Sequence, residues 1–200
     1  MLETGFDKLL NITTIGEQKI NNSNYYNIYE PTSYLALETL TSSFHISEDE
    51  RIIDYGCGKG RLNFYLNYKF NCFVTGIEMN TYYFKEANNN IKSFSIKNHF
   101  NNDKINFLNI LAQDYKVLDN DTIFYFFNPF TVHIFMKVIS NIFKSLDNCY
   151  RKIYVILYYP LPDYIYYLDN NTSLFLEKEI KIPGLFEKDN NHRFLIYSNI

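Results

Sequence analysis

The segment RIIDYGCGKGRL, at residues 51–62, decides the fold. Its first part, RIIDYG, is typical of a buried strand, and residues 60–69 are expected to form the helix that follows. Gly56, Gly58 and Gly60 stand between the two, where the backbone must turn sharply and a Cβ would collide with an approaching ligand. A glycine-rich turn that leaves a strand and opens a helix is the context in which nucleotide-type ligands bind. The segment therefore predicts a ligand site at the end of this strand.

The rest of the chain beyond residue 50 continues the alternation of strands and helices. Further strands are expected at residues 72–78, 104–110, 122–128 and 152–160, and further helices at residues 81–97 and 132–146. This order predicts a Rossmann-like α/β fold, a doubly wound and mostly parallel sheet with helices on both faces. Residues 175–183 and 192–199 look like two strands without a long helix between them, so an antiparallel C-terminal pair completes a seven-stranded sheet.

The N-terminal part of the chain has a different character. After Pro31 the segment TSYLALETLTSSF predicts an amphipathic helix, with Thr32 or Ser33 as its N-cap. We interpret residues 1–48 as an N-terminal helical lid, or substrate-side extension, and residues 49–200 as the ligand-binding domain. Tyr29 and Tyr34 are candidates for the lining of the ligand site, although the core or the surface is the commoner place for a tyrosine in a chain with 19 of them.

Composition narrows the class of protein. The chain has 200 residues, 46% of them hydrophobic, which is enough for one domain with a real core and far from the signature of disorder. Its net charge of −3 lacks the basic excess that nucleic-acid binding usually needs, so nucleic acid is a less favoured partner. The three cysteines are scattered without metal-binding spacing, and no segment has the apolar length of a membrane span. We therefore expect a cytoplasmic protein without a metal site or a membrane partner.

Glu78 is the second feature that identifies a ligand. It ends the second strand, about 20 residues after the glycine turn, where a carboxylate accepts hydrogen bonds from both hydroxyls of a ribose. The glycine turn and this acid together predict an adenosine-type ligand. A dinucleotide site usually has the spacing G-x-G-x-x-G, whereas here the third glycine comes one residue earlier.

The segment DYGCGKG, from Asp54 to Gly60, resembles the first motif of the class I S-adenosylmethionine (SAM)-dependent methyltransferases, D/E-x-G-x-G-x-G, at every fixed position. In that family the glycine loop contacts the methionine part of SAM, the acid after the second strand binds the ribose, and residues after the third strand flank the adenine. The resemblance implies SAM as cofactor, and it carries over to this chain residue by residue. The implied SAM-binding residues are Asp54, Gly56, Cys57, Gly58, Gly60, Glu78, Met79, Asn109 and Ile110, with Leu111 as an alternative beside the adenine.

Cys57, and the glycine loop together with Glu78, also allow other interpretations. Cys57 could be considered a nucleophile, but its place within the glycine loop favours a small side chain that fills space. The glycine loop and Glu78 also fit a purely structural interpretation, a tight turn and a solvated strand end.

The fourth strand ends in FFNPF, with Asn128, Pro129 and Phe130 at the sheet edge where ligands of open α/β sheets bind. This resembles the N-P-P-Y/F motif of methyltransferases that modify planar amines in adenine bases or glutamine amides, but only one proline is present. We take the three residues as candidates for the catalytic site. In the structural alternative, Asn128 and Pro129 end the strand and Phe130 packs in the core.

These features predict a SAM-dependent methyltransferase acting on a small-molecule or protein acceptor. Two alternatives remain: a tRNA or rRNA methyltransferase that modifies a base amine, and a non-catalytic nucleotide-binding module. The acceptor, the methylated atom and the oligomeric state do not follow from the sequence.

Overall fold

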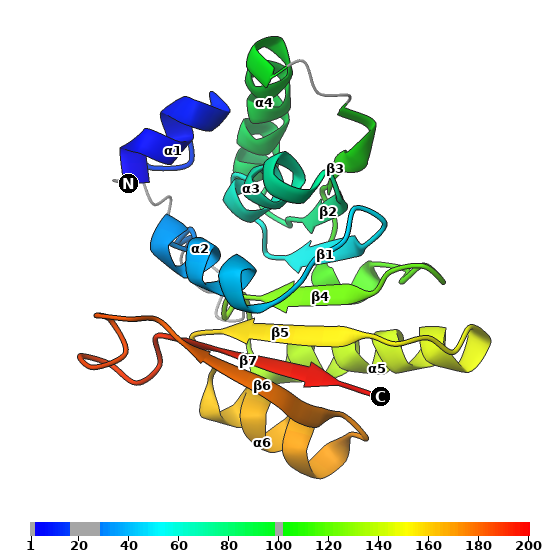
Figure 1. Ribbon diagram of the computed structural model, residues 1–200. Coiled ribbons are helices and arrows are strands. Elements are labelled where there is room, and N and C mark those ends of the chain that lie inside the picture. The colour runs from blue at the N-terminus through cyan, green and yellow to red at the C-terminus, as the bar shows by residue number, and fades with distance from the viewer. Residues whose placement is uncertain (1–2, 17–28, 99–101) are drawn as a thin grey trace.

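The computed structural model describes residues 3–16, 29–98 and 102–200, and within them a seven-stranded sheet carries the fold (Figure 1). The strand order is β3-β2-β1-β4-β5-β7-β6. All neighbouring pairs from β3 to β5 are parallel, whereas β7 runs antiparallel to both β5 and β6. The predicted Rossmann-like fold with an antiparallel C-terminal pair is confirmed. The strands are β1 (Arg51–Tyr55), β2 (Phe73–Ile77), β3 (Ile105–Leu108), β4 (Ile123–Phe126), β5 (Tyr154–Tyr158), β6 (Phe175–Lys181) and β7 (Arg193–Ser198).

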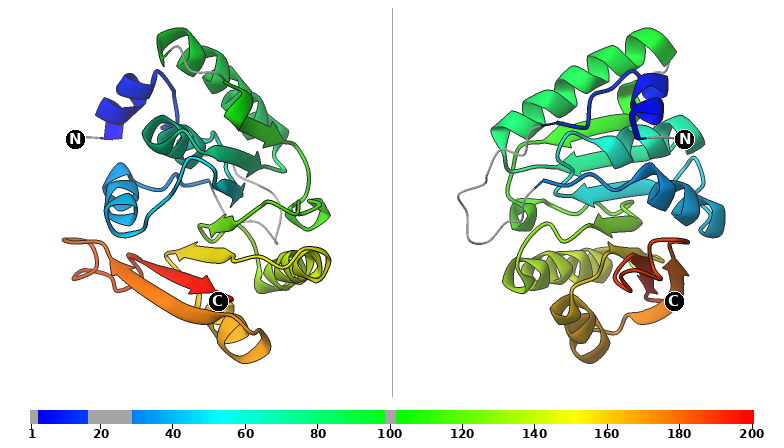
Figure 2. Two further views of the ribbon diagram at one scale, coloured as in Figure 1. Left: turned by 45° about the vertical axis from the view of Figure 1, so that its right-hand side comes forward. Right: turned by 90° about the vertical axis from the view of Figure 1, so that its left-hand side faces the viewer.

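Six α-helices cover the two faces of the sheet, and the left view of Figure 2 shows α2 and α3 on one side with α5 on the other. Side chains from α1 to α4 share one core cluster with one face of the strands, and those of α5 and α6 share a second cluster with the other face. The helices are α1 (Glu3–Leu10), α2 (Tyr34–Ser43), α3 (Arg61–Phe70), α4 (Thr81–Asn98), α5 (Val132–Asn148) and α6 (Pro162–Asn171), with 3-10 turns η1 (Asn102–Lys104) and η2 (Ala112–Asp114).

The central strands explain why the sequence segment 51–62 decides the fold. In β1 and β4 almost every residue is buried, because helices cover both faces of the sheet at these positions. Apolar side chains therefore fill both sides of these strands without alternation. The crossover at β1 separates β2 and β3 on one side from β4 and β5 on the other, which leaves an opening at the carboxyl ends of β1 and β4.

Helices α1 and α2 pack against the domain itself. Leu10, Leu37 and Leu40 are buried in the same core cluster as residues of α3 and the sheet. Ser33 is the N-cap of α2, where its Oγ accepts a hydrogen bond from the Ala36 amide at 3.2 Å. Of the two predicted caps, Ser33 is therefore the one used. The role of residues 1–48 as a substrate-side lid stays a prediction, and residues 17–28 of this segment lie outside the described part of the chain.

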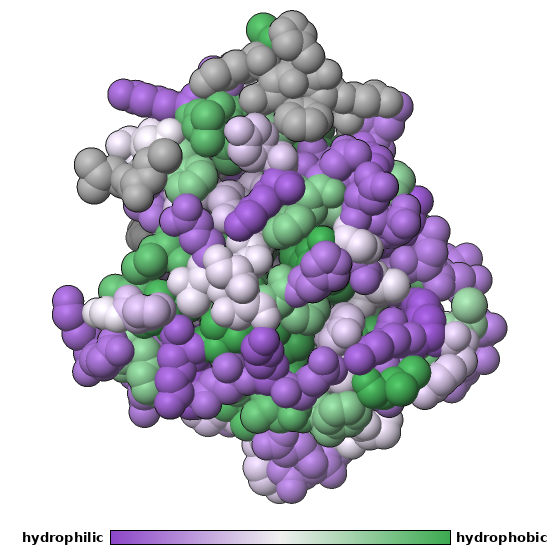
Figure 3. All heavy atoms as spheres, in the orientation of Figure 1, coloured by the Kyte–Doolittle hydropathy of each residue, from purple (hydrophilic) through white to green (hydrophobic). Residues whose placement is uncertain are grey.

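Two helices were not expected from the sequence. The first is α1, and the second is α6, which joins β5 to β6 and starts with Pro162 in its first turn. On the face of the molecule in Figure 3, apolar residues reach the surface between polar ones. Within the described ranges, none of the helices combines the length and the hydrophobicity that crossing a membrane needs.

Candidate active site

A cavity opens at the carboxyl ends of β1, β2 and β4, beside the segment that precedes α2. Its empty space, including the open solvent at its mouth, amounts to about 810 Å³. We call it the donor cavity. Its wall contains Tyr29, Glu30, Pro31, Thr32, Asp54, Gly56, Cys57, Arg61, Leu62, Ile77, Glu78, Met79, Tyr83, Ile110, Ala112, Tyr125, Phe127, Asn128, Pro129 and Phe130.

The glycine loop and Glu78 meet at this cavity. One carboxylate oxygen of Glu78 accepts a hydrogen bond from the Gly58 amide at 2.9 Å, and the other accepts one from the Asn80 amide at 2.7 Å. The carboxylate therefore faces the turn that leaves β1. These two bonds use part of its acceptor capacity, because a carboxylate has about four lone-pair positions. Burial raises the pKa of Glu78, and the two amide bonds oppose that shift.

Asp54 lies in β1 and lines the same cavity, and only 5% of the residue is exposed. Asn63, with its amide oriented to satisfy both neighbours, donates to Asp54 Oδ2 at 2.9 Å and accepts from the Gly76 amide. Burial, followed by the negative charge of Glu78, raises the pKa of Asp54 to about 8. Asp54 therefore holds a proton near neutral pH until a positive charge is placed beside it.

The three glycines of the loop are required by the chain's own packing. All have a positive φ, and a Cβ on Gly58 would lie 2.1 Å from the ring of Tyr29. A Cβ on Gly56 would collide with Pro129, and one on Gly60 with Phe107. The sequence predicted that a ligand approaches the space where a Cβ of these glycines would lie. In the structure, side chains of the protein itself fill that space. The loop still forms the cavity wall through Gly56 and Cys57.

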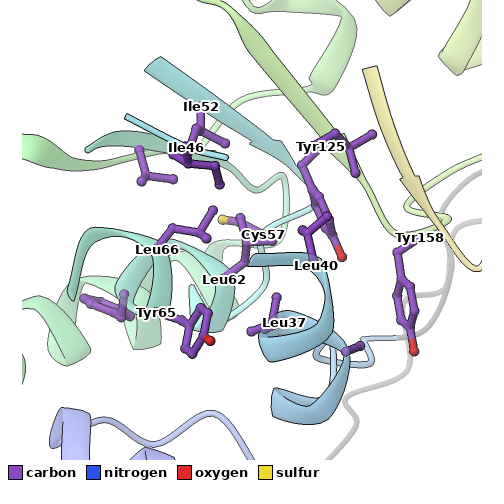
Figure 4. Packing of buried hydrophobic residues seen from close by; sticks show 14 of the residues in the cluster. Leu37, Leu40, Ile46, Ile52, Cys57, Leu62, Tyr65, Leu66, Tyr125 and Tyr158 are labelled. Atoms are coloured by element: carbon purple, nitrogen blue, oxygen red, sulfur yellow. The ribbon is translucent and has the colours of Figure 1, made fainter. Parts of the chain in front are cut away.

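Cys57 fills space, as the sequence indicates. Figure 4 shows its side chain beside Leu62 and Leu66, within the apolar cluster between α3 and the sheet. Burial raises the pKa of the Cys57 thiol well above its usual value, and the Asp54 and Glu78 carboxylates add to that shift. The thiolate that a nucleophile needs is therefore disfavoured.

The residues predicted to flank an adenine divide into two groups. Met79 and Ile110 line the donor cavity. Asn109 instead connects the loop after β3 to the loop after β2. Its Nδ2 donates hydrogen bonds to the carbonyls of Glu78 at 2.8 Å and Met79 at 3.0 Å. Leu111 is exposed and does not contribute to the described wall. Asn109 thus fixes the backbone that carries Glu78 and Met79.

The NPF segment lies at the cavity wall, but its side chains are engaged within the protein. Asn128 has a φ of 41°, and its Nδ2 donates to the Tyr159 carbonyl. Phe130 is 1% exposed, packs edge-on against Phe126, and its carbonyl accepts a hydrogen bond from the Tyr164 hydroxyl. The location of the segment fits a role near the reacting centre, while the contacts of Phe130 are those of a core residue.

Arg61 is the residue that the sequence analysis missed. It directly follows the third glycine, lines the donor cavity and is 3% exposed. Its Nε donates to Thr14 Oγ1 at 2.7 Å, and its Nη1 donates to Glu3 and to the Thr32 carbonyl. Its Nη2 is buried and has no hydrogen-bond acceptor within the described part of the chain. A buried donor without a partner costs about 1 to 3 kcal/mol, so this nitrogen is suited to receive an acceptor from a ligand.

Tyr29 and Tyr34, the two tyrosine candidates, have different positions. Tyr29 lines the cavity, packs against Tyr83 with tilted rings whose centroids are 4.7 Å apart, and donates through its hydroxyl to the Thr14 carbonyl. Tyr34 is fully buried and donates to Asp7 at 2.6 Å. Of the pair, Tyr29 therefore belongs to the cavity and Tyr34 to the core.

Comparison with known proteins identifies the family. Residues 46–158, more than half of the chain, match the family described as "Methyltransferase domain". The chain belongs to this family. It is a SAM-dependent methyltransferase of the class I fold, and the match leaves the acceptor unspecified. No curated protein sequence is significantly similar to the methyltransferase.

Solved structures share the fold at low sequence identity. A Haemophilus influenzae protein proposed to be a methylase is 18% identical, with a TM-score of 0.56, over 82% of this chain and 93% of that one. An rRNA methylase from Streptococcus thermophilus is 12% identical, with a TM-score of 0.53, over 82% and 90%. The geranyl diphosphate C-methyltransferase from Streptomyces coelicolor A3(2), solved with Mg²⁺, geranyl diphosphate and S-adenosylhomocysteine, is 13% identical, with a TM-score of 0.52, over 82% and 76%.

Proposed function

We propose that the methyltransferase binds SAM in the donor cavity, with the ribose at Glu78 and the adenine between Met79 and Ile110. The free lone pairs of the Glu78 carboxylate are suited to accept from the two ribose hydroxyls. The methionine part of SAM then lies along Gly56 and Cys57.

The observation that carries this proposal is that a buried carboxyl group and a buried guanidinium nitrogen without an acceptor among the described residues both belong to side chains that line the donor cavity. Methionine in SAM has an ammonium group and a carboxylate on the same carbon atom. Asp54 offers a buried carboxyl group, and Arg61 offers a buried Nη2 that still needs an acceptor. We assign the ammonium to Asp54 and the carboxylate to Arg61, because each ligand charge then satisfies a group that burial penalises.

Methyl transfer depends on the alignment of the acceptor with the methyl group of SAM more than on acid–base chemistry. A lone pair of the acceptor forms a bond to the methyl carbon, while the S–CH₃ bond breaks and its electron pair stays on sulfur as a thioether. The sulfonium charge disappears in this step, so the protein does not have to stabilise a new charge on the donor. In well-oriented systems, alignment of the reactants lowers the activation barrier by about 7 to 11 kcal/mol. We ascribe a contribution of this size to this site. The proposed acceptor is a small molecule or a protein, and the proposed compartment is the cytoplasm.

The test compares two ligands that differ in their amino-acid part. S-adenosylhomocysteine (SAH) has the ammonium and the carboxylate, whereas 5′-methylthioadenosine has the same nucleoside without them. Titration calorimetry on the Arg61→Gln variant is expected to show about 1.5 to 3 kcal/mol weaker SAH binding, because a charged hydrogen bond is lost. The affinity for methylthioadenosine should stay within about twofold of the unmodified protein, since a change of 0.4 kcal/mol is already a factor of two.

This comparison separates a local effect from a folding defect. Arg61 also contacts Glu3 and Thr14, so the variant will lose some stability. Unchanged methylthioadenosine binding shows that the nucleoside part of the site has survived. Equal losses for both ligands would remove Arg61 from the carboxylate site, and no SAH binding by the unmodified protein would refute the proposed donor site.

A second candidate function is methylation of a base amine in tRNA or rRNA. One observation favours it, namely that Asn128 and Pro129 lie at the wall of the donor cavity, as the resemblance to the N-P-P-Y/F motif requires. Binding to an RNA of mixed sequence should then weaken steeply as salt rises. RNA binding that is absent at low salt would eliminate this candidate.

A further inference from the structure

A second cavity lies next to the donor cavity and shares part of its wall. Its described lining consists of Glu30, Pro31, Ser33, Phe127, Tyr158, Tyr159, Leu185 and His192, and it encloses about 630 Å³ including its open mouth. Glu30, Pro31 and Phe127 line both cavities. A molecule in the second cavity would therefore lie directly beside a ligand in the donor cavity, which is the arrangement that methyl transfer requires.

Aromatic residues make up half of the described lining of this second cavity. Phe127 follows β4, Tyr158 ends β5 and Tyr159 follows it, and His192 precedes β7, so the ends of three strands supply the rings. Phe127 packs edge-on against Tyr158 with ring centroids 4.7 Å apart, and Tyr159 packs edge-on against His192 at 5.1 Å. The loop between β6 and β7 that carries His192 lies beside the carboxyl end of β5 (Figure 1).

The backbone at Tyr159 is held in a conformation that a bulky residue rarely adopts. Its φ is 50°, and its carbonyl accepts the hydrogen bond from Asn128, which itself has a φ of 41°. The hydroxyl of Tyr159 donates to Asp189 at 2.5 Å. Backbone strain of this kind persists where the surroundings enforce it, and it concentrates at functional sites. Here it fixes the ring of Tyr159 at the edge of the cavity.

The charge of the lining is negative. Glu30 contributes a carboxylate, and the described lining contains neither lysine nor arginine. Burial is the main reason why the pKa of Tyr158 is raised to about 12, and the carboxylate of Glu30 adds to this shift. Glu30 and Tyr158 line the same cavity. Basic residues or a metal would be needed to hold a phosphate or a diphosphate, and this wall offers a carboxylate instead.

We propose that this second cavity binds the methyl acceptor and that the acceptor is a small molecule with a positively charged nitrogen next to a planar or apolar group. The aromatic faces of Phe127 and Tyr159 attract a cation, and Glu30 complements its charge. Anionic acceptors, including nucleic acid and diphosphates, meet repulsion from the same carboxylate. This inference rests on the proposed function, because it takes the neighbouring cavity as the SAM site.

Three probes with the same phenol ring isolate the role of charge. Tyramine has an ammonium group, 4-ethylphenol is uncharged, and 4-hydroxyphenylacetate has a carboxylate. Each is titrated calorimetrically into the 200-residue protein saturated with SAH. We expect tyramine to bind about fivefold more tightly than 4-ethylphenol, the size of a partly exposed cation–π and ion-pair contribution, and 4-hydroxyphenylacetate to bind most weakly.

Two variants assign the effect to the cavity. Glu30→Gln, titrated at saturating SAH, should remove most of the advantage of tyramine over 4-ethylphenol. Glu48→Gln is the matched control, because Glu48 is exposed in the turn before β1, at the opposite edge of the sheet. This control should keep the preference for tyramine.

The outcomes separate this inference from the proposed function. Failure of SAH to bind would refute the donor site itself. If SAH binds but tyramine does not, or if the carboxylate probe binds as well as tyramine, the acceptor inference is wrong. The acceptor inference is also wrong if Glu30→Gln and Glu48→Gln show the same preference for tyramine over 4-ethylphenol.

Discussion

We expect the buried carboxyl group of Asp54 to make the binding of S-adenosylhomocysteine depend on pH. Its pKa is raised to about 8 from an ordinary value of 3.8, mainly by burial. The proposed ligand places an ammonium beside it, and a neighbouring positive charge lowers the pKa of a carboxyl group. Binding at pH 7 therefore releases the proton of Asp54. The affinity for SAH should rise with pH between about 6 and 8, by up to about tenfold per pH unit for one proton.

The Asp54 carboxyl group also affects the stability of the fold. A rise in pH lowers the free energy of unfolding, whereas it raises the affinity for SAH. Between about pH 4 and pH 8 the folded protein keeps a proton that the unfolded chain has lost. The free energy of unfolding without ligand should therefore fall as pH rises through this window, by up to about 1.4 kcal/mol per pH unit. Asp54→Asn removes the titration and keeps the shape of the side chain. This variant should lose the contribution of residue 54 to the pH dependence of both folding and binding.

Calorimetry in two buffers with different ionisation enthalpies measures the proton directly. We expect release of nearly one proton per SAH at pH 7 by the unmodified protein and none by Asp54→Asn. The α-ammonium of a free amino acid such as SAH keeps its proton above pH 8, because a carboxylate lies next to it, so the affinity should level off once Asp54 has lost its proton in the free protein. An affinity that does not change from pH 6 to 8, or the same proton release by both proteins, would refute the role given to Asp54.

Three further predictions concern the glycine loop and its neighbours. Glu78→Ala should weaken SAH binding by about 1 to 3 kcal/mol through the lost charged hydrogen bonds, while circular dichroism shows an intact fold; unchanged affinity would remove Glu78 from the site. Gly58→Val should abolish SAH binding and lower the melting temperature, because a Cβ at a φ of 55° would lie 2.1 Å from the ring of Tyr29; normal binding by this variant would contradict the loop geometry. Cys57→Ala should retain methyl transfer, and the native thiol should resist iodoacetamide at pH 7.5 because its pKa is raised; rapid alkylation would show that it is accessible and ionised.

The sequence predicts the sheet well, because its strands are short apolar runs separated by turn signals and helices. The two helices that were not predicted from the sequence, α1 and α6, were missed for different reasons. Helix α6 begins with Leu161, Pro162 and Asp163, a helix-start signal that the sequence contains. Helix α1 has eight residues, and its buried Asp7 is bonded to Thr14 and Tyr34. A helix this short depends on such tertiary contacts, which no local pattern reveals.

The residues that line the cavity were predictable where a side chain's position follows from its place along a strand. Asp54 and Glu78 stand at strand ends and meet at the cavity for that reason. The contact of Tyr29 with Gly58 and the unpaired nitrogen of Arg61 depend on how the N-terminal segment folds back onto the loop. The position of Arg61 directly after the last glycine was its only sequence signal.

A crystal structure of the protein with SAH tests the central claim most directly. The account predicts SAH in the donor cavity, with its ribose hydroxyls on Glu78 and its carboxylate on Nη2 of Arg61. SAH bound elsewhere, or bound there with its carboxylate directed away from Arg61 and its ribose away from Glu78, would contradict it.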